Sequence, residues 1–254
     1  MVKRKKSKTA LKPSSSKKKS NKSSKSIFKR IGRFIAKMLL AFFILSIGFV
    51  LLYRFVPVVF TPLMFIRVVE QVADGESVKL RREWVSIDEI SPNMSNAVIA
   101  SEDNLFMEHN GFDFDGIQKA IKHNQRKKRI RGGSTISQQT AKNVFLYPKR
   151  SYIRKGLEAY FTVLIELFWP KERIMEVYLN VIETGNGIYG VEKASQVYFN
   201  KPAAKLSKSQ AAYIAVCLPN PRKFNPQYPS SYIKRRKAKI VNLMHAIGPV
   251  NLKE

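Results

Sequence analysis

The sequence has few acidic residues, few histidines and a single cysteine. It contains 18 Asp and Glu against 46 Lys and Arg, a formal net charge of +28. The first 69 residues hold no acid at all, although 17 of the basic residues lie there. One cysteine excludes an intrachain disulfide, and three scattered histidines do not suggest a metal site. Such a chain attracts anionic partners: nucleic acid, acidic lipid or phosphorylated substrates.

The acid-free region divides into a tail and an apolar run. Residues 1–34 are rich in Lys and Ser, which predicts a disordered basic tail. The run Met38–Tyr53, with its flanks, predicts a transmembrane helix over residues 35–56. A cleaved signal peptide is the alternative, but no A-x-A site follows the run. The positive-inside rule then keeps the tail in the cytoplasm and the remainder outside, which argues against a nucleic-acid partner.

The remainder is predicted to be a membrane-proximal interfacial linker over residues 57–84 and a mostly α domain over 85–254. The linker is apolar at its start but is broken by Pro57 and Pro62. Helix signals dominate the domain: Ser91 before Pro92 is an N-cap pattern, and stripes of apolar residues recur at helical spacing over 153–168 and 174–182. Residues 207–210 form a capping box, and only residues 76–87 suggest a short strand or extended linker.

Several segments combine polar residues in patterns that suit chemistry. "SEDNLFMEHNGFDFDG", residues 101–116, follows the apolar "NAVIA", so Glu102 would emerge from a buried helix with a raised pKa, as general acid–base work requires. An acidic turn or a hard-cation site are the alternatives. Arg154 and Glu158 lie four residues apart on one helical face, either as an exposed ion pair or as a charged face turned into a cleft.

The segment "RGGSTISQQTAKN", residues 131–143, has glycines and hydroxyls but lacks Walker A spacing and a preceding strand. Its backbone amides could hold an anion or a sugar, and a flexible polar loop is the alternative. Gly185, Gly187 and Gly190 are interpreted as turn glycines between helices. Trp84 and Trp169 are predicted to be packing residues. Cys217, in the apolar "AAYIAVCLP", is predicted to be a buried thiol.

Taken in order, these segments resemble one family. Residues 102–111 match the first motif of this family, E-D-x-x-F-x-x-H-x-G, and residues 132–139 match the second, G-G-S-T-I-[ST]-Q-Q. Residues 154–158 match the third, R-K-x-x-E, and a fourth motif extends over residues 171–180. The chain is similar to the peptidoglycan glycosyltransferases of family 51, most closely to the monofunctional biosynthetic peptidoglycan transglycosylases. The resemblance covers residues 91–228, most of the globular part.

The resemblance implies a lysozyme-like, mostly α glycosyltransferase domain behind an N-terminal transmembrane helix. Its reaction would add lipid II to a lipid-linked glycan, with inversion, a new β-1,4 bond and release of undecaprenyl pyrophosphate. Glu102 would be the base and Glu158 the second essential carboxylate, which positions the donor or its counter-cations. The residues expected to bind substrate are Asp103, Phe106, His109, Gly132, Gly133, Ser134, Thr135, Gln138, Gln139, Lys142, Arg150, Arg154 and Lys155.

Lipid II, the lipid-linked glycan strand, the membrane and cell-wall synthesis proteins are the expected partners. No cofactor is expected to be required, although Mg or Mn could assist; the metal ligands are unknown. The expected location is the bacterial cytoplasmic membrane, with one pass and an extracytoplasmic (periplasmic) catalytic domain. Two alternatives remain open: a lytic transglycosylase or lysozyme-type hydrolase, and a non-catalytic membrane-anchored scaffold.

Overall fold

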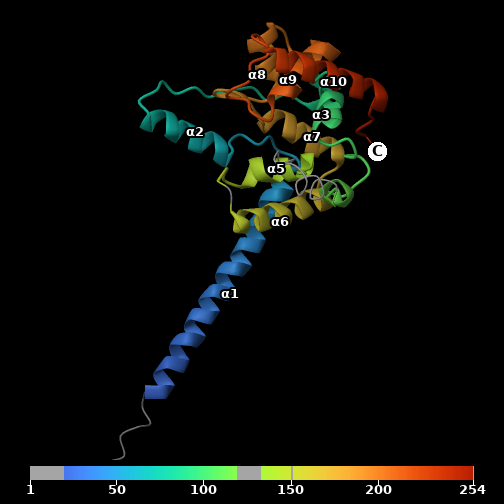
Figure 1. Cartoon of the computed structure of the whole chain (residues 1–254). Coiled ribbons are helices and arrows are strands. Elements are labelled where there is room, and N and C mark those ends of the chain that lie inside the picture. Colours follow the sequence, from blue (N-terminus) through green and yellow to red (C-terminus); the bar gives the residue numbers. More distant parts are fainter. Residues whose placement is uncertain (1–19, 119–132, 150, 254) are drawn as a thin grey trace, which may run out of the picture. The chain divides into compact units, whose positions relative to one another are not determined.

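The structure is a computed structural model that describes residues 20–118, 133–149 and 151–253 (Figure 1). The chain divides into two compact units, Met1–Phe49 and Val50–Glu254. Helix α1, Ser20–Tyr53, supplies the described part of the first unit and enters the second. Its stretch Ile27–Tyr53 is long and apolar enough to cross a membrane.

The second unit is mostly helical, as the sequence predicts. After α2 (Pro62–Ala73) come η1 (Ile87–Glu89), α3 (Pro92–Glu102), α5 (Ile136–Phe145), α6 (Tyr152–Phe168), α7 (Lys171–Val181), α8 (Val191–Phe199), η2 (Ala203–Lys205), α9 (Lys208–Cys217) and α10 (Ser231–Ile247). The predicted caps are confirmed: the Ser91 hydroxyl accepts from the Asn93 amide, and Ser207 and Gln210 form a reciprocal capping box. These caps satisfy amides that a helix start leaves without an internal partner.

A small sheet lies beside the helices, with strand order β1–β3–β2. β1 (Arg81–Arg82) pairs in parallel with β3 (Ile188–Tyr189), and β3 pairs in antiparallel fashion with β2 (Glu183–Gly185). The glycine-rich segment predicted as a tight loop between helices is therefore a short hairpin. Gly187 has φ +69°, and a Cβ there would lie 2.4 Å from the Lys79 carbonyl oxygen. Only glycine allows the hairpin to approach the strand before it so closely.

The helices of the second unit form two packed groups. One contains α3, α9 and α10, and the other contains α5, α6 and α7 (Figure 1). The predicted apolar stripe of α7 is buried throughout, whereas in α6 Phe161 and Leu164 are buried and Ile153 is 77% exposed. The α6 stripe therefore contributes to the core only through its later turns. Cys217 is buried as predicted, and burial raises the pKa of its thiol to about 12.

The last turn of α1 belongs to the second unit and is fastened to α7 and to Trp169, the residue directly after α6. The Trp169 indole donates to the Val50 carbonyl at 2.7 Å. The Arg173 guanidinium donates to the carbonyls of Tyr53 at 2.8 Å and Val56 at 2.7 Å, and it lies over the Trp84 ring. Both tryptophans therefore act as packing residues, as the sequence predicts. The Arg173 bond satisfies the Tyr53 carbonyl at the end of α1, and the Trp169 bond adds a second donor to the Val50 carbonyl.

Candidate active site

Glu102 lies at the end of α3, two residues after the buried run Ala97–Ala100. Its Oε2 accepts a hydrogen bond from Gln139 Nε2 at 3.0 Å. The Tyr178 hydroxyl donates to Gln139 Oε1 at 3.3 Å, which orients the amide so that its NH₂ faces the carboxylate. Burial raises the pKa of Glu102, while Gln139, Arg236 and Lys142 act in the opposite direction. A desolvated carboxylate of this kind is suited to accept a proton near neutral pH.

Asp103 connects the first motif to the start of α5. Its Oδ2 accepts from the Ile136 amide at 2.9 Å, and its Oδ1 lies 2.9 Å from His109 Nε2. The Gly111 amide donates to His109 Nδ1 at 3.1 Å, so the ring proton belongs on Nε2 and points at Asp103. Asp103 is nearly fully buried. These bonds fix the position of the adjacent Glu102 relative to α5.

The second motif forms the start of α5. Thr135 caps the helix: its hydroxyl accepts from the Gln138 amide, and the Gln138 side chain accepts from the Thr135 amide. The Thr135 hydroxyl also donates to the Gly111 carbonyl at 2.7 Å. Thr135 and Gln138 are buried, whereas Gly133 and Ser134 before them are exposed. From Thr135 onward this segment is a capped helix, so the flexible-loop alternative is wrong there; Gly132 lies outside the described residues.

Gly111 must approach α6 very closely. Its φ is +86°, and a Cβ there would lie 2.7 Å from Thr162 Cγ2 and 2.9 Å from Glu166 Cγ. Both the backbone conformation and the space therefore require glycine. This position places the His109–Gly111 turn between α5 and α6.

Phe106 lies in the core with no exposed surface. The Lys171 ammonium lies 4.7 Å from the Phe106 ring centroid, donates to the His109 carbonyl at 2.6 Å and pairs with Glu166 at 2.9 Å. Ser137 also hydrogen-bonds to Glu166. Lys171 thus joins the first motif to α6 and α7, a role that the sequence interpretation did not assign to it.

The third motif is a buried charge cluster on α6. Glu158 is 3% exposed, and its Oε2 accepts from Arg154 Nη1 at 2.6 Å while its Oε1 pairs with Lys155. Arg154 is also buried, and its Nε has no hydrogen-bond partner within the described part of the chain. The exposed-ion-pair alternative is therefore wrong. The Lys155 side chain is about half exposed, so its ammonium is accessible from solvent. Arg150 lies outside the described residues.

Lys142 interacts electrostatically with both carboxylates of the candidate site, Glu102 and Glu158. Burial lowers the pKa of Lys142; Glu158 and, more weakly, Glu102 oppose this shift, and Arg154 and Lys155 reinforce it. Lys142 also borders a cavity of about 150 Å³ between α2 and α5. Leu63, Arg67, Lys142, Asn143, Leu146, Pro148 and Glu183 line it. Arg67 and Glu183 lie outside the sequence-predicted set.

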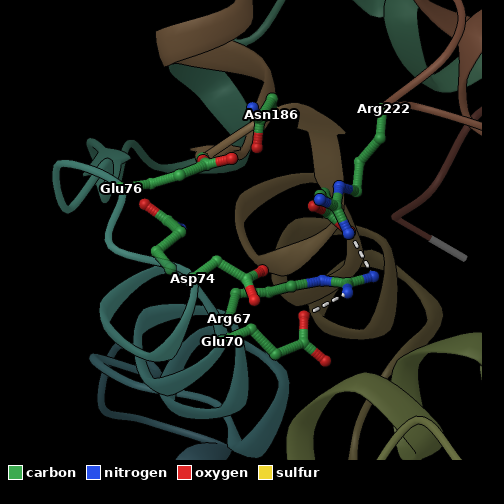
Figure 2. Close-up of a pocket in the computed structure, with 9 residues that line it drawn as sticks. Arg67, Glu70, Asp74, Glu76, Asn186 and Arg222 are labelled. Carbon is green, nitrogen blue, oxygen red and sulfur yellow. Dashed lines mark hydrogen bonds and ion pairs between the residues drawn. The ribbon is translucent and has the colours of Figure 1, made fainter.

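Arg67 and Glu183 also border a second, smaller pocket (Figure 2). Arg67 pairs with Glu70 at 2.6 Å and with Glu183 at 3.6 Å, which fastens α2 to the β2–β3 hairpin. The other labelled side chains, Asp74, Glu76, Asn186 and Arg222, surround these pairs (Figure 2). None of the predicted site residues lines this pocket, and we assign it a structural role.

No group of three or more His, Cys, Asp or Glu suited to hold a metal ion occurs among residues 20–118, 133–149 and 151–253. The described site instead combines one desolvated carboxylate, Glu102, with cations grouped around a buried carboxylate, Glu158. This combination suits the chemistry of one class of protein, group-transfer enzymes, in which a desolvated carboxylate can accept a proton and fixed cations can bind an anionic group.

Comparison with known proteins agrees with this class. A family model described as "Transglycosylase" matches residues 68–245. A biosynthetic peptidoglycan transglycosylase of Bdellovibrio bacteriovorus is 57% identical over 86% of this chain and 87% of its own length. A protein of the same description from Bacteroides thetaiotaomicron is 57% identical over 86% of this chain and 88% of its own length. Another, from Caulobacter vibrioides, is 52% identical over 83% of this chain and 93% of its own length. The chain belongs to the transglycosylase family and is a peptidoglycan glycosyltransferase, which polymerises glycan strands.

Sequence reasoning missed several residues that the structure joins to this site. Lys171 and Tyr178 lie within the fourth motif, so their spacing carried a signal that was available. Arg67 and Arg236 belong to no motif. Their positions depend on how α2 and α10 pack against elements that are distant in sequence, which local patterns do not encode.

Proposed function

We propose that this glycosyltransferase uses lipid II as acceptor and a lipid-linked glycan as donor. The acceptor 4-hydroxyl attacks the donor C1 as the C1–O bond to pyrophosphate breaks. The products are an inverted β-1,4 linkage and free undecaprenyl pyrophosphate. Glu102 is the general base that takes the hydroxyl proton. Its desolvation and its hydrogen bond from Gln139 support this role. A direct displacement needs one base and no covalent glycosyl-enzyme.

Lys142 and Lys155 neutralise the departing pyrophosphate, and the buried Arg154 adds to the positive charge of this group. This leaving group needs charge stabilisation more than it needs a proton, and fixed cations in a desolvated site provide it most effectively. The observation that carries the proposal is the cation group on α6, where Arg154 donates to the buried Glu158 at 2.6 Å and Lys155 pairs with its other oxygen. The electrostatic effects of Glu158 and Glu102 on the pKa of Lys142 support the addition of Lys142 to this group. We extend the phosphate-binding set to Arg150 on the resemblance alone.

Glu158 is a positioning residue in this proposal. Both of its carboxylate oxygens are engaged by cations of its own helix, so it orients them toward the donor. Asp103, Phe106, Thr135 and Gln138 are buried and His109 is partly buried, and all five likewise hold the cleft in shape. Their polar atoms are already satisfied within the protein, or, for Phe106, the ring lies in the core. Direct sugar contacts then belong to the exposed Gly133 and Ser134 and to Gln139, and the proposal extends them to Gly132.

The orientation of the protein in the membrane is inferred from its basic tail, its apolar helix α1 and the exposed apolar side chains near α2. The basic tail stays in the cytoplasm, α1 crosses once, and the enzyme domain lies outside. Phe60 and, on α2, Phe65, Val69 and Val72 are exposed apolar side chains at helical spacing. We assign this face to the outer membrane–water interface. Catalyst and both lipid-linked substrates are then confined to one surface, which raises their effective concentration.

No cofactor is required in this mechanism. The residues that surround Glu158 are the protein's own cations, so a divalent ion such as Mg or Mn would add to an existing charge site.

The rival enzyme activity is glycan cleavage of the lytic transglycosylase or lysozyme type. A glycan cleaver has no pyrophosphate to stabilise, and the cation group around Glu158 argues against it. Incubation of the purified full chain with labelled lipid II separates the two. We expect polymer to form from monomer. Shortening of added glycan without new polymer would favour the glycan-cleaving enzyme. If neither polymer nor shortened glycan formed, the result would favour the non-catalytic membrane-anchored scaffold.

A further inference from the structure

The outer face of α6 is exposed and apolar, and the proposed reaction does not use it. Ile153, Val163 and Leu167 are 77%, 53% and 70% exposed. With Gly156 and Tyr160 between them, they follow one another at spacings of three, four, three and four, which places them on one side of the helix. None of these five positions holds a charged residue. We name Ile153, Gly156, Tyr160, Val163 and Leu167 the outer face of α6.

The opposite face of α6 contributes to the core and to the candidate site. Arg154, Glu158 and Ile165 are buried there, and α6 packs against α5 and α7 (Figure 1). The outer face therefore points away from the elements against which α6 packs. Contiguous exposed apolar surface marks a contact with a membrane or with another protein. A helix with one apolar side and one charged side is also the pattern of a helix that lies in a membrane interface.

The end of α6 lies against the stretch that is apolar enough to cross a membrane. Trp169 directly follows α6, and its indole donates to the Val50 carbonyl at 2.7 Å. Val50 lies three residues before the end of the Ile27–Tyr53 stretch, which is about 5 Å along a helix axis. Leu167 lies two residues before Trp169. The C-terminal end of the outer face is therefore close to the last turn of that stretch, which favours the membrane over another protein as the partner of this face.

We propose that the outer face of α6 lies among the lipid acyl chains at the outer surface of the membrane that α1 crosses. The inference rests on the proposed function for the orientation of α1 and for pyrophosphate binding at Lys155, and it adds a membrane contact separate from that of α2. An in-plane helix buries its apolar side about 5–10 Å into the boundary between headgroups and acyl chains. The Lys155 side chain is about half exposed, so its ammonium can reach the level of the headgroups.

This placement gives α6 two connected tasks. Its outer face holds the helix in the bilayer, and its cations bind the pyrophosphate of a donor whose lipid remains in the same bilayer. The donor then reaches Lys155 with its phosphates near the depth of the lipid headgroups, so its lipid need not be withdrawn from the acyl region. Tyr152, 99% exposed at the start of α6, is an aromatic residue of the kind enriched where membrane meets water.

The test places a fluorescent label on the outer face of α6 and measures which quencher reaches it. Cys217 is the only cysteine of the sequence and is buried, so an introduced cysteine is the one labelled. The variants are Val163→Cys and Leu167→Cys in the full chain, reconstituted into phosphatidylglycerol–phosphatidylethanolamine vesicles with brominated or ordinary acyl chains. Tyr228→Cys is the control, because Tyr228 is 82% exposed and shortly precedes α10, on the side of the domain away from α6 (Figure 1).

We expect brominated lipid to reduce the fluorescence of both α6 labels about twofold or more, because the labels lie in the acyl region. Aqueous iodide on both sides of the membrane should leave the α6 labels unchanged, whereas the control label should respond to iodide alone. Quenching of the α6 labels by iodide and not by brominated lipid would overturn the inference. Shielding from both quenchers would also overturn it, since protein would then cover the face.

Two further measurements keep the outcomes distinct. If either α6 variant unfolds at a lower temperature than the wild type, Ile153→Cys replaces it, because Ile153 belongs to the same face. Polymerisation of lipid II by the wild type is measured in the same vesicles. If no polymer formed, the proposed function would fail, while the quenching result would still decide whether α6 contacts the acyl chains.

Discussion

Replacement of Glu158 by glutamine tests whether this carboxylate holds the buried Arg154 in place. In the wild type, Arg154 is buried and donates to Glu158 at 2.6 Å, and its Nε already lacks a partner within the described residues. Removing one partner of a buried ion pair costs about 3–5 kcal/mol, because the other charge remains desolvated. Glutamine keeps one acceptor oxygen, so we expect the low end, about 3 kcal/mol.

For a domain of this size, that loss lowers the unfolding temperature by about 6–12 °C. Thermal unfolding of the detergent-solubilised full chain, followed by circular dichroism, measures it. The double variant Arg154→Met/Glu158→Met is the matched control, because it removes both charges and should recover most of the stability while polymerisation stays low. An unchanged unfolding temperature for Glu158→Gln would refute the reasoning, since it would mean that Arg154 does not depend on this carboxylate.

Three further changes test the site. Burial raises the pKa of Glu102, so polymerisation by the wild type should already fall in acid at a pH above the ordinary glutamate pKa of about 4.5. Burial lowers the pKa of Lys142, so the rate should also fall in alkali at a pH below the ordinary lysine pKa of about 10.5. Lys142→Arg should move only the alkaline limb, to higher pH, and a pH–rate profile with an unmoved limb would exclude Lys142 as its source. Gly111→Ala should cost about 2 kcal/mol or more in denaturant unfolding, because the left-handed φ and the contact with α6 both disfavour a Cβ. Tyr178→Phe should lower kcat about 3–10-fold with little change in KM, because Gln139 loses the bond that orients it toward Glu102; a changed KM with unchanged kcat would contradict this.

Local features of the fold could be predicted well from the sequence. The caps at Ser91 and Ser207 lie where their side chains satisfy the first amides of a helix, and that chemistry involves only the next few residues. The hairpin of β2 and β3 was missed because strands of three and two residues are too short for alternation to be detected. Its position depends on a parallel partner, β1, about a hundred residues earlier.

For the candidate site, the motifs mark segments that the structure brings together, but they do not say what each residue contacts. Thr135 and Gln138 resemble ligand-binding residues in sequence, and in the structure they form a helix cap. Asp103 accepts from an amide 33 residues later, a contact that no local pattern encodes. The Arg154–Glu158 spacing suggested a pair but not its burial, since burial depends on how α6 packs against α5.

The central claim is that Glu102 removes the acceptor proton, and polymerisation of lipid II by Glu102→Gln tests it most directly. A general base contributes about 10²–10⁴-fold, or roughly 3–5 kcal/mol of barrier. We predict that loss in kcat. We also predict an unfolding temperature equal to or above that of the wild type, because the raised pKa means that the charged carboxylate lowers stability at neutral pH and the amide does not. Near-wild-type turnover by a folded Glu102→Gln protein would contradict the account.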